Sequence, residues 1–261
     1  MQTLRPLALA ICLIPFAPQA GATQCSAQSG PRTAVLVELY TSEGCDSCPP
    51  ADRWLSSLQS QGYTPDKVVP LALHVDYWDY IGWKDPYAKR EFAIRQRKLA
   101  DLKRAKIIYT PQVVMQGQDF RKWGTSDFGA AVAKANSLPA RAKIGLALIA
   151  MGRTSVDVTI MAELLSAQER ADAAVYLAAF ENKLSSQVAA GENRGKTLPH
   201  DYVVREWIGP IEFGADLKVA DKRSLPLLPN AIPKNSGVAA FVQNRSTGDV
   251  LQALMLPACS G

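Results

Sequence analysis

Two cysteines separated by two residues, Cys45 and Cys48, stand between a segment typical of a buried strand and a segment typical of an amphipathic helix. Residues 34–40 form an apolar, β-branched run, which predicts the strand. Apolar residues then recur at the i, i+3, i+4, i+7 spacing of one helix face: Ala51, Trp54, Leu55 and Leu58. A thiol in the first turn of a helix faces free backbone N–H groups and the positive end of the helix dipole, which favour the thiolate. The arrangement predicts Cys45 as an attacking thiol and Cys48 as the thiol that resolves a mixed disulfide.

The residues around this dithiol modify the prediction. Glu43 and Asp46 add negative charge, which disfavours the thiolate and opposes the helix dipole. The Pro49-Pro50 pair restricts Cys48 away from helical backbone angles, so we expect the regular helix to begin at or after Pro49. A structural disulfide and ligation of a metal ion stay open as alternatives to redox catalysis.

The segments that follow predict a β-α-β-α-β-β-α order over residues 33–138. Residues 67–75 read as a second strand, and Asp85-Pro86 as the N-cap and first residue of a long helix. Residues 112–116 and 119–123 fit a hairpin, and Ser126 is expected to cap the last helix. Beyond Pro139 the predicted strands are residues 142–150, 155–161, 173–180, 202–207, 213–219, 238–243 and 251–256. The alanine-rich segment 171–180, which includes the third of these strands, also fits a helix.

These elements indicate two domains after a leader. We expect a signal peptide at residues 1–22, a thioredoxin-like α/β domain at 31–139 and an all-β, sandwich-like domain at 140–261. Ordinary globular values, with 48% hydrophobic and 20% charged residues, exclude a disordered chain or a membrane protein with many spans. Proline-rich residues 221–236 are expected to form an exposed loop.

The leader has the three parts of a secretory signal: a basic start at Arg5, an apolar run over residues 7–16 and small residues at Ala20 and Ala22. The run is too short for a spanning helix, which predicts cleavage near Ala22 and no transmembrane segment in the mature chain. Removing 22 of the 261 residues leaves 239, with a net charge of +4 because Arg5 leaves too. The predicted location is the periplasm or the medium, and such a mild charge does not indicate nucleic acid.

Cleavage changes the set of cysteines, because Cys12 leaves with the leader. Four cysteines then remain in a compartment that permits disulfides. Cys45 and Cys48 are close in sequence, whereas Cys25 and Cys259 lie near opposite ends. A Cys25–Cys259 bond would tie the chain ends together, and the alternative is two free thiols.

Further candidate site residues follow the second strand. His74 and Asp76 share a face by the period of two, so both can point toward the dithiol as copper or zinc ligands, as proton carriers, or simply as groups that satisfy backbone at a strand end. The aromatic residues after them, including Trp78, suit either loop packing or a substrate platform. Thr110-Pro111 opens the third strand, where a cis proline would place backbone beside the dithiol for an extended substrate. The basic residues of 84–106 fit a solvated helix face or attraction of an acidic partner.

Together, the dithiol after the first strand and the proline before the third resemble the thioredoxin superfamily. More closely, residues 38–45, 73–83, 109–112, 191–193 and 200–205 resemble the secreted family catalogued as domain of unknown function 1223. This resemblance implies a thioredoxin-like fold and a secreted location, and it brings no established substrate.

The sequence therefore predicts an exported thiol–disulfide oxidoreductase with Cys45 and Cys48 as its redox-active centre and Thr110, Pro111 and Trp78 against the substrate. Its partner would be an envelope protein, as substrate or as redox partner, and no cofactor is required. One alternative is a copper or zinc binding or delivery module built on Cys45, Cys48 and His74, with Asp76 as a further ligand. Another is a non-catalytic binding protein with a structural Cys45–Cys48 disulfide.

Overall fold

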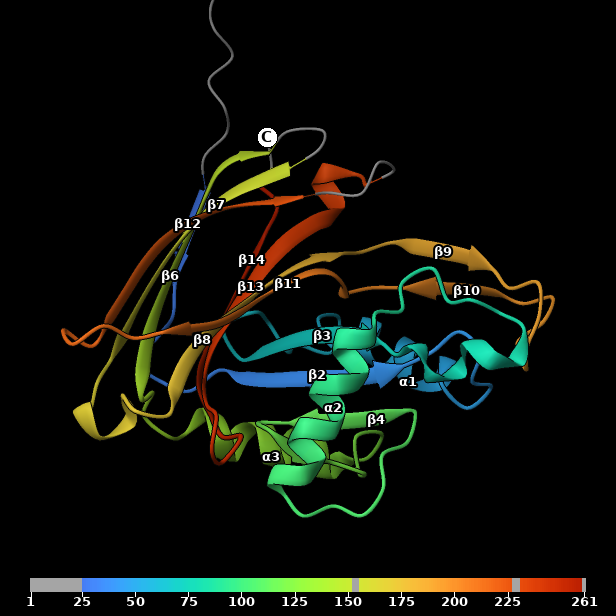
Figure 1. Ribbon diagram of the computed structural model, residues 1–261, viewed down its shortest axis with the longest axis horizontal. Helices are drawn as coiled ribbons and strands as arrows, with labels where there is room; N and C mark the ends of the chain where they lie inside the picture. The colour runs from blue at the N-terminus through green and yellow to red at the C-terminus, as the bar shows by residue number, and fades with distance from the viewer. Residues whose placement is uncertain (1–24, 152–154, 227–230, 260–261) are drawn as a thin grey trace, which may run out of the picture.

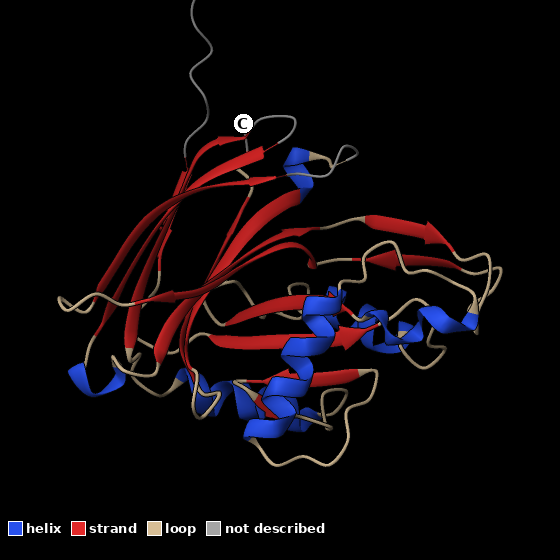
Figure 2. Ribbon diagram, viewed as in Figure 1, coloured by secondary structure: helices blue, strands red, loops and turns tan. Residues whose placement is uncertain are grey.

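The computed structural model describes residues 25–151, 155–226 and 231–259 (Figure 1). The expected signal peptide at residues 1–22, with Cys12, lies outside these ranges. Three α-helices, three short 3-10 helices and fourteen strands make up the described residues, and strands dominate the view in Figure 2. Within the same residues, no helix combines the length and the apolar character that crossing a membrane requires.

The elements before residue 139 are β1 (Cys25–Gln28), β2 (Val35–Thr41), α1 (Pro49–Ser57), β3 (Val68–His74), the 3-10 helix η1 (Asp76–Ile81), α2 (Arg90–Leu102), β4 (Gln112–Met115), β5 (Gln118–Asp119) and α3 (Ser126–Asn136). Those after it are β6 (Ala142–Met151), β7 (Ser155–Leu164), η2 (Ala167–Glu169), β8 (Ala173–Glu181), β9 (Leu184–Gln187), β10 (Thr197–His200), β11 (Val203–Glu212), β12 (Lys218–Pro226), η3 (Pro233–Asn235), β13 (Ser236–Asn244) and β14 (Val250–Pro257).

One eight-stranded sheet runs through the molecule in the order β14-β13-β8-β11-β3-β2-β4-β5. Its centre holds the parallel pair β2 and β3, and β4 runs antiparallel on the other side of β2. On the outer side of β3, β11 pairs in parallel, with Val203 opposite Ala72. The strands from the second half of the chain therefore continue the sheet that the first half begins.

This sheet corrects the expected fold class. A thioredoxin-like α/β domain followed by an all-β sandwich is wrong, because the molecule is mostly strand and strands from both sides of residue 139 hydrogen-bond into one large sheet. The physical reason is that strand pairing depends on hydrogen bonds between remote segments, which the period of a single segment does not reveal.

A second sheet, ordered β1-β6-β7-β12, packs against part of the first. β8 shows how one strand serves two cores, because its side chains alternate between faces. Tyr176 and Phe180 belong to the apolar cluster that includes the helices, whereas Val175 and Leu177 belong to the cluster beneath the second sheet. A strand buried on both faces has to be apolar at nearly every position, and this explains why residues 171–180 also fitted a helix.

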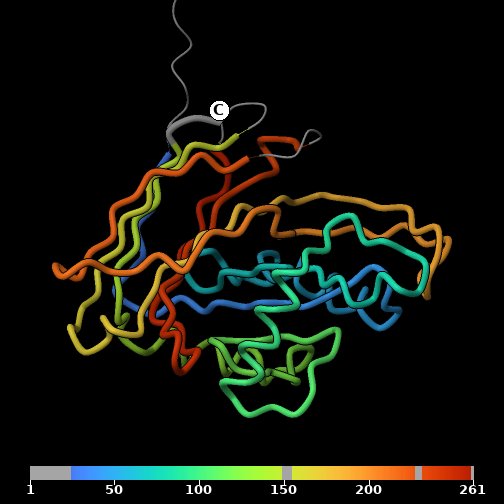
Figure 3. Tube along the Cα trace, in the orientation of Figure 1, coloured from blue at the N-terminus to red at the C-terminus, as the bar shows by residue number. Residues whose placement is uncertain are grey.

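The chain ends are tied by a disulfide between Cys25 and Cys259, whose Cα atoms are 5.6 Å apart. Figure 3 shows the first and last described segments next to each other at one end of the molecule. The remaining pair of strands, β9 and β10, forms a separate two-stranded sheet. In Figure 1 this hairpin extends as an arm past the ends of β2 and β3, where α1 begins.

Candidate functional site

The Cys45–Cys48 pair is joined as a disulfide in the turn between β2 and α1, with Cα atoms 5.5 Å apart. α1 begins at Pro49, as the sequence predicts. The expectation that Pro49 keeps Cys48 out of helical angles is wrong, since Cys48 is the N-cap with φ −76° and ψ −40°. Its carbonyl accepts the N–H groups of Ala51 and Asp52 at 2.9 and 3.1 Å, so these helical bonds offset the cost of the angles before proline.

Both cysteines are covered in this structure. Cys45 is 1% exposed and Cys48 is 0% exposed, while Asp46 and Ser47 between them lie at the surface. The Ser47 hydroxyl lies 3.3 Å from the Cys45 sulfur. A molecule in solution therefore cannot reach either sulfur until a neighbouring group moves.

The predicted substrate-binding residues form one connected group. Trp78, in η1, donates its indole N–H to the Thr110 hydroxyl at 2.7 Å. Thr110–Pro111 is a cis peptide bond, and both residues are half-buried. A Cβ placed on Gly44 would lie 3.2 Å from the Cβ of Trp78, so the glycine lets the dithiol loop, residues 42–48, pack closely against Trp78. The structure thus brings Trp78 between Thr110 and the dithiol loop.

The candidate metal ligands are not assembled as a set. His74 ends β3 fully buried, and its Nδ1 lies 2.7 Å from the Asp85 carboxylate. Asp76 begins η1 and is half-buried. The two cysteine sulfurs are bonded to each other. Across residues 25–151, 155–226 and 231–259, no group of three His, Cys, Asp or Glu side chains is placed to hold a metal ion.

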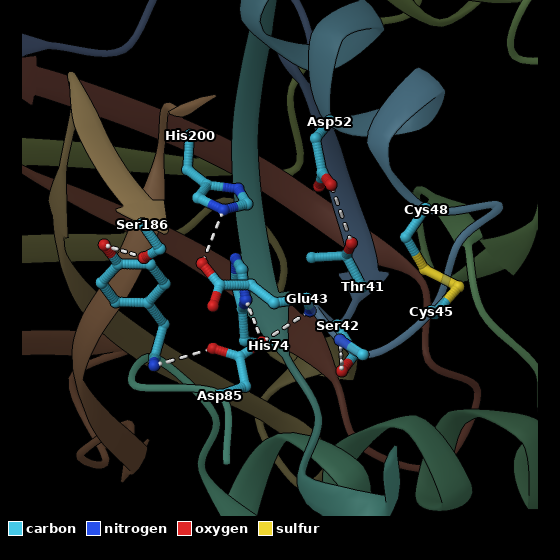
Figure 4. A network of polar contacts seen from close by, with 12 residues as sticks. Thr41, Ser42, Glu43, Cys45, Cys48, Asp52, His74, Asp85, Ser186 and His200 are labelled. Carbon is cyan, nitrogen blue, oxygen red and sulfur yellow. Dashed lines mark hydrogen bonds and ion pairs between the residues drawn. A yellow bond between two sulfur atoms is a disulfide. The ribbon is translucent and has the colours of Figure 1, made fainter. Parts of the chain in front are cut away.

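Asp85, which the sequence suggested as a helix N-cap, is instead a centre of the buried network in Figure 4. α2 begins only at Arg90. The Asp85 carboxylate accepts the backbone N–H groups of Glu43 and Tyr87, each at 2.9 Å, besides contacting His74. The N-cap prediction is wrong because Asp85 opens only a short turn, with the Ala88 N–H bonded to the Asp85 carbonyl, and the N-cap of α2 is Lys89.

His74 and Asp85 shift each other's pKa. Burial by itself lowers the pKa of His74, but the Asp85 carboxylate outweighs it, and the pKa of His74 is raised. Burial by itself raises the pKa of Asp85, but His74 and the backbone N–H groups outweigh it, and the pKa of Asp85 is lowered. Each partner therefore stabilises the charged form of the other.

A second buried pair joins the two halves of the chain. The Glu43 carboxylate lies 3.0 Å from Nε2 of His200, in β10, and accepts the Trp83 indole N–H at 2.8 Å. The imidazole rings of His200 and His74 meet edge to face, with centroids 4.9 Å apart. The carboxyl group that the sequence places beside the dithiol is therefore held by a partner more than 150 residues away.

Asp52 is the third buried carboxyl group of this region, one helical turn after Cys48. Its Oδ2 accepts the Thr41 hydroxyl at 3.2 Å, whereas its Oδ1 has no hydrogen-bond partner within the described residues. Burial raises its pKa, although both histidines act in the opposite direction. Asp52 therefore holds a proton more readily than an exposed aspartate.

Asn193, from the loop between β9 and β10, holds the dithiol loop directly. It is 0% exposed and donates its side-chain amide to the carbonyl oxygens of Glu43 and Cys45, both at 2.8 Å. Its neighbour Glu192 accepts the Asp46 N–H at 3.0 Å. Gly191, with φ +75°, serves a tight turn in this loop.

Sequence reasoning missed Asp85 and Asn193 as members of the site. Asp85 carries an Asp-Pro signal that equally fits a helix start, and Asn193 lies in a glycine-rich string that equally fits an ordinary turn. In the sequence, Asp85 and Asn193 each stand out only as a polar residue among turn-forming residues. The groups that they bind are visible only in the structure.

Comparison with known proteins extends over the whole site. The family model described as a protein of unknown function, DUF1223, matches residues 36–243, a range that includes the dithiol and Asn193. A protein of Agrobacterium tumefaciens with a known crystal structure is 26% identical, with a TM-score of 0.62 and coverage of 89% of this chain and 98% of that one. HBP35 of Porphyromonas gingivalis shares the fold alone, at 15% identity and a TM-score of 0.65 over 88% of this chain and 76% of that one. No curated protein matches this chain.

Proposed function

We propose that this protein, which belongs to the DUF1223 family, is a thiol–disulfide oxidoreductase that acts on exported proteins through Cys45 and Cys48. The observation that carries the proposal is the position of the Cys45–Cys48 pair immediately before the nine-residue helix α1, in the turn that follows a fully buried strand. The helix N-terminus favours a thiolate there. The rigid strand and helix fix the two sulfurs relative to each other.

In the reduced form, the Cys45 thiolate attacks a disulfide of the substrate. A Cys45–substrate bond forms, the substrate S–S bond breaks, and one substrate sulfur leaves as a thiolate. Cys48 then loses its proton and attacks the Cys45 sulfur, which releases the second substrate sulfur. The substrate disulfide is reduced to two thiols and the protein dithiol is oxidised to the observed disulfide. A dithiol partner regenerates the reduced form by the same exchange in reverse.

Trp78, Thr110 and Pro111 are proposed to contact the substrate. The hydrogen bond from Trp78 to Thr110 and the close approach of Trp78 to Gly44 support this role, because they join the proline turn to the dithiol loop. An extended substrate segment that lies along Thr110 would meet both the backbone of this turn and the ring of Trp78.

We also propose an exported location, with cleavage near Ala22. Its support is the arrangement of Arg5, the apolar run over residues 7–16 and the small residues that follow. Sequencing the N-terminus of the mature protein from cell envelope and medium tests this proposal, and a chain that still begins at Met1 would contradict it.

A structural disulfide within a non-catalytic binding protein is the second candidate function. The burial of both cysteines favours it, because a sulfur that no partner reaches exchanges with none. Copper or zinc binding has no comparable support, since the described residues bring no three ligands together.

The deciding experiment is the equilibrium reduction potential of the Cys45–Cys48 pair in the Cys25→Ser/Cys259→Ser variant, where no other disulfide contributes. A potential between about −120 and −270 mV supports exchange, and one below about −300 mV marks a structural bond. Trapping complements it, because Cys48→Ala leaves a mixed disulfide unresolved. Envelope proteins should accumulate on Cys45 of this variant and not on a Cys45→Ala/Cys48→Ala control; if none does, exchange is not the function.

A further inference from the structure

The covered dithiol poses a question that the proposed function leaves open, namely which part of the molecule must move before exchange. Exchange requires a sulfur of the partner to approach the Cys45 sulfur in line with the S–S bond. Cys45 is 1% exposed, so the observed conformation does not allow this approach. The part that moves has to meet two requirements. It contacts the dithiol loop, and it can leave this loop without unfolding the sheet.

Residues 188–196, which connect β9 to β10, meet the first requirement, and we name them the cover loop. Asn193 is its buried polar side chain, and both of its N–H donors go to the dithiol loop, at the carbonyls of Glu43 and Cys45. Glu192 adds the bond to the Asp46 N–H. The neighbours Arg194, Gly195 and Lys196 are exposed.

The second requirement is also met, because the cover loop is held mainly by bonds within itself. Its backbone bonds run from Gly195 to Val188, from Arg194 to Gly191 and from Lys196 to Asn193. The hairpin that carries it is a two-stranded sheet of its own rather than part of the eight-stranded sheet. The loop can therefore leave as one unit while the neighbouring sheet stays intact.

Gly191 shows that the loop closes tightly against the end of η1 and the residues after it. A Cβ added at Gly191 would lie 3.0 Å from Cδ1 of Ile81 and 3.5 Å from the Cβ of Trp83, and its φ of +75° disfavours other residues. A side chain at this position would press on Ile81 and strain the backbone of the loop. The closed conformation thus depends on Gly191 for contact and on Asn193 for hydrogen bonds.

We propose that the cover loop is a gate over Cys45–Cys48 and that Asn193 is the positioning residue that latches it. This inference rests on the proposed function. When Asn193 leaves, the carbonyl oxygens of Glu43 and Cys45 are freed beside the disulfide. An extended polypeptide that donates its backbone N–H groups replaces Asn193 at these two oxygens, so the substrate class that opens the gate is an unfolded or extended segment around a cysteine.

The test is the rate at which dithiothreitol reduces Cys45–Cys48 in the full mature chain, followed by alkylation and mass spectrometry without denaturant. Asn193→Ala should raise this rate at least tenfold. The matched control is Asn136→Ala, because the Asn136 amide also donates to two backbone carbonyls, those of Thr33 and Lys67, far from the dithiol. Asn136→Ala should leave the rate unchanged, and equal acceleration in both variants would overturn the gate in favour of general loosening.

A second variant keeps the test decisive if Asn193→Ala does not fold. Gly191→Ala retains Asn193 and strains the closed loop at a backbone φ of +75°, so the reduction rate should again rise, by severalfold. A wild-type rate in every folded variant would overturn the proposal. The two proposals fail separately: faster reduction with no partner trapped by Cys48→Ala keeps the gate and removes the oxidoreductase, whereas trapping with unchanged rates keeps the oxidoreductase and removes the gate.

Discussion

The two disulfides of this molecule close very different loops in very different surroundings. Cys25–Cys259 joins residues 234 positions apart and packs against the apolar cluster beneath the second sheet. Cys45–Cys48 spans three positions and lies two residues after the buried Glu43, whose carboxyl group contacts His200. A long closed loop removes more conformational entropy from the unfolded chain than a short one does. The comparison teaches that the Cys25–Cys259 bond mainly stabilises the fold. The Cys45–Cys48 bond adds less stability, and what distinguishes it is the buried polar network beside it.

The largest effect should come from removing the long-range bond. Cys25→Ser/Cys259→Ser is expected to lower the free energy of unfolding by about 5 kcal/mol, and Cys45→Ser/Cys48→Ser by about 2 kcal/mol, from loop entropy alone. Urea unfolding of both variants measures the difference. The first variant should keep its exchange activity and the second should lose it. If the stability losses come in the opposite order, the division of roles is wrong.

The buried network is the next place to test the comparison. Asp85→Asn removes the charge that pairs with His74, and breaking a buried pair on one side should cost about 3 kcal/mol. Asp249→Asn is the control, because the Lys103–Asp249 pair is 31% and 43% exposed and should contribute less than about 1 kcal/mol. Urea unfolding measures the free energy of unfolding of both variants. If the two variants lose similar amounts, the His74–Asp85 pair is not stabilised by its burial.

The pH dependence of stability should report the same pair. The raised pKa of His74 gives stability that is complete below pH about 6.5 and is lost as pH rises through the folded-state value. The lowered pKa of Asp85 gives stability that is complete above pH about 4 and is lost as pH falls through its folded-state value. The pair therefore contributes most between these limits, with slopes of at most about 1.4 kcal/mol per pH unit.

His74→Gln isolates this contribution. Its stability should lack the alkaline decline that wild-type shows above pH about 6.5, measured by urea unfolding from pH 4 to 9. An unchanged alkaline decline in the variant would assign the titration to another group.

The smallest effect concerns the contact between the proline turn and the dithiol loop. Trp78→Phe keeps an aromatic ring and removes the hydrogen bond to Thr110, which should lower the free energy of unfolding by about 1 kcal/mol. Trp54→Phe is the matched control for the loss of ring size, and its exchange rate should equal that of wild-type. If Trp78→Phe also exchanges at the wild-type rate, Trp78 has no part in binding the substrate.

Local patterns predicted the elements that carry the dithiol. The apolar run at residues 34–40 became β2 at Val35–Thr41, and the stripe from Ala51 to Leu58 became the buried face of α1. These predictions hold because burial of one strand or helix face is written into the spacing of its own apolar residues.

The partners of the site were beyond such reasoning. Asn193 lies 148 positions from Cys45 and His200 lies 157 positions from Glu43. Asn193 and His200 belong to or adjoin the β9–β10 hairpin, which precedes β11, and β11 lies in the sheet between β3 and β8. The same remote pairing overturned the two-domain fold class. The periodicity of a sequence does not show which residue forms the hydrogen bonds that each buried polar group needs.

The separation of Cys45 from Asn193 also has a consequence in time. Ribosomes add about 5–20 residues per second, so a nascent chain presents Cys45 and Cys48 for about 7 to 30 s before residue 193 exists. During this interval the sulfurs are unshielded and Cys25 is only 20 residues away, whereas its native partner Cys259 is made last. Until Cys259 is made, Cys25 can therefore pair with Cys45 or Cys48, and any such bond has to be exchanged before the native pairs form.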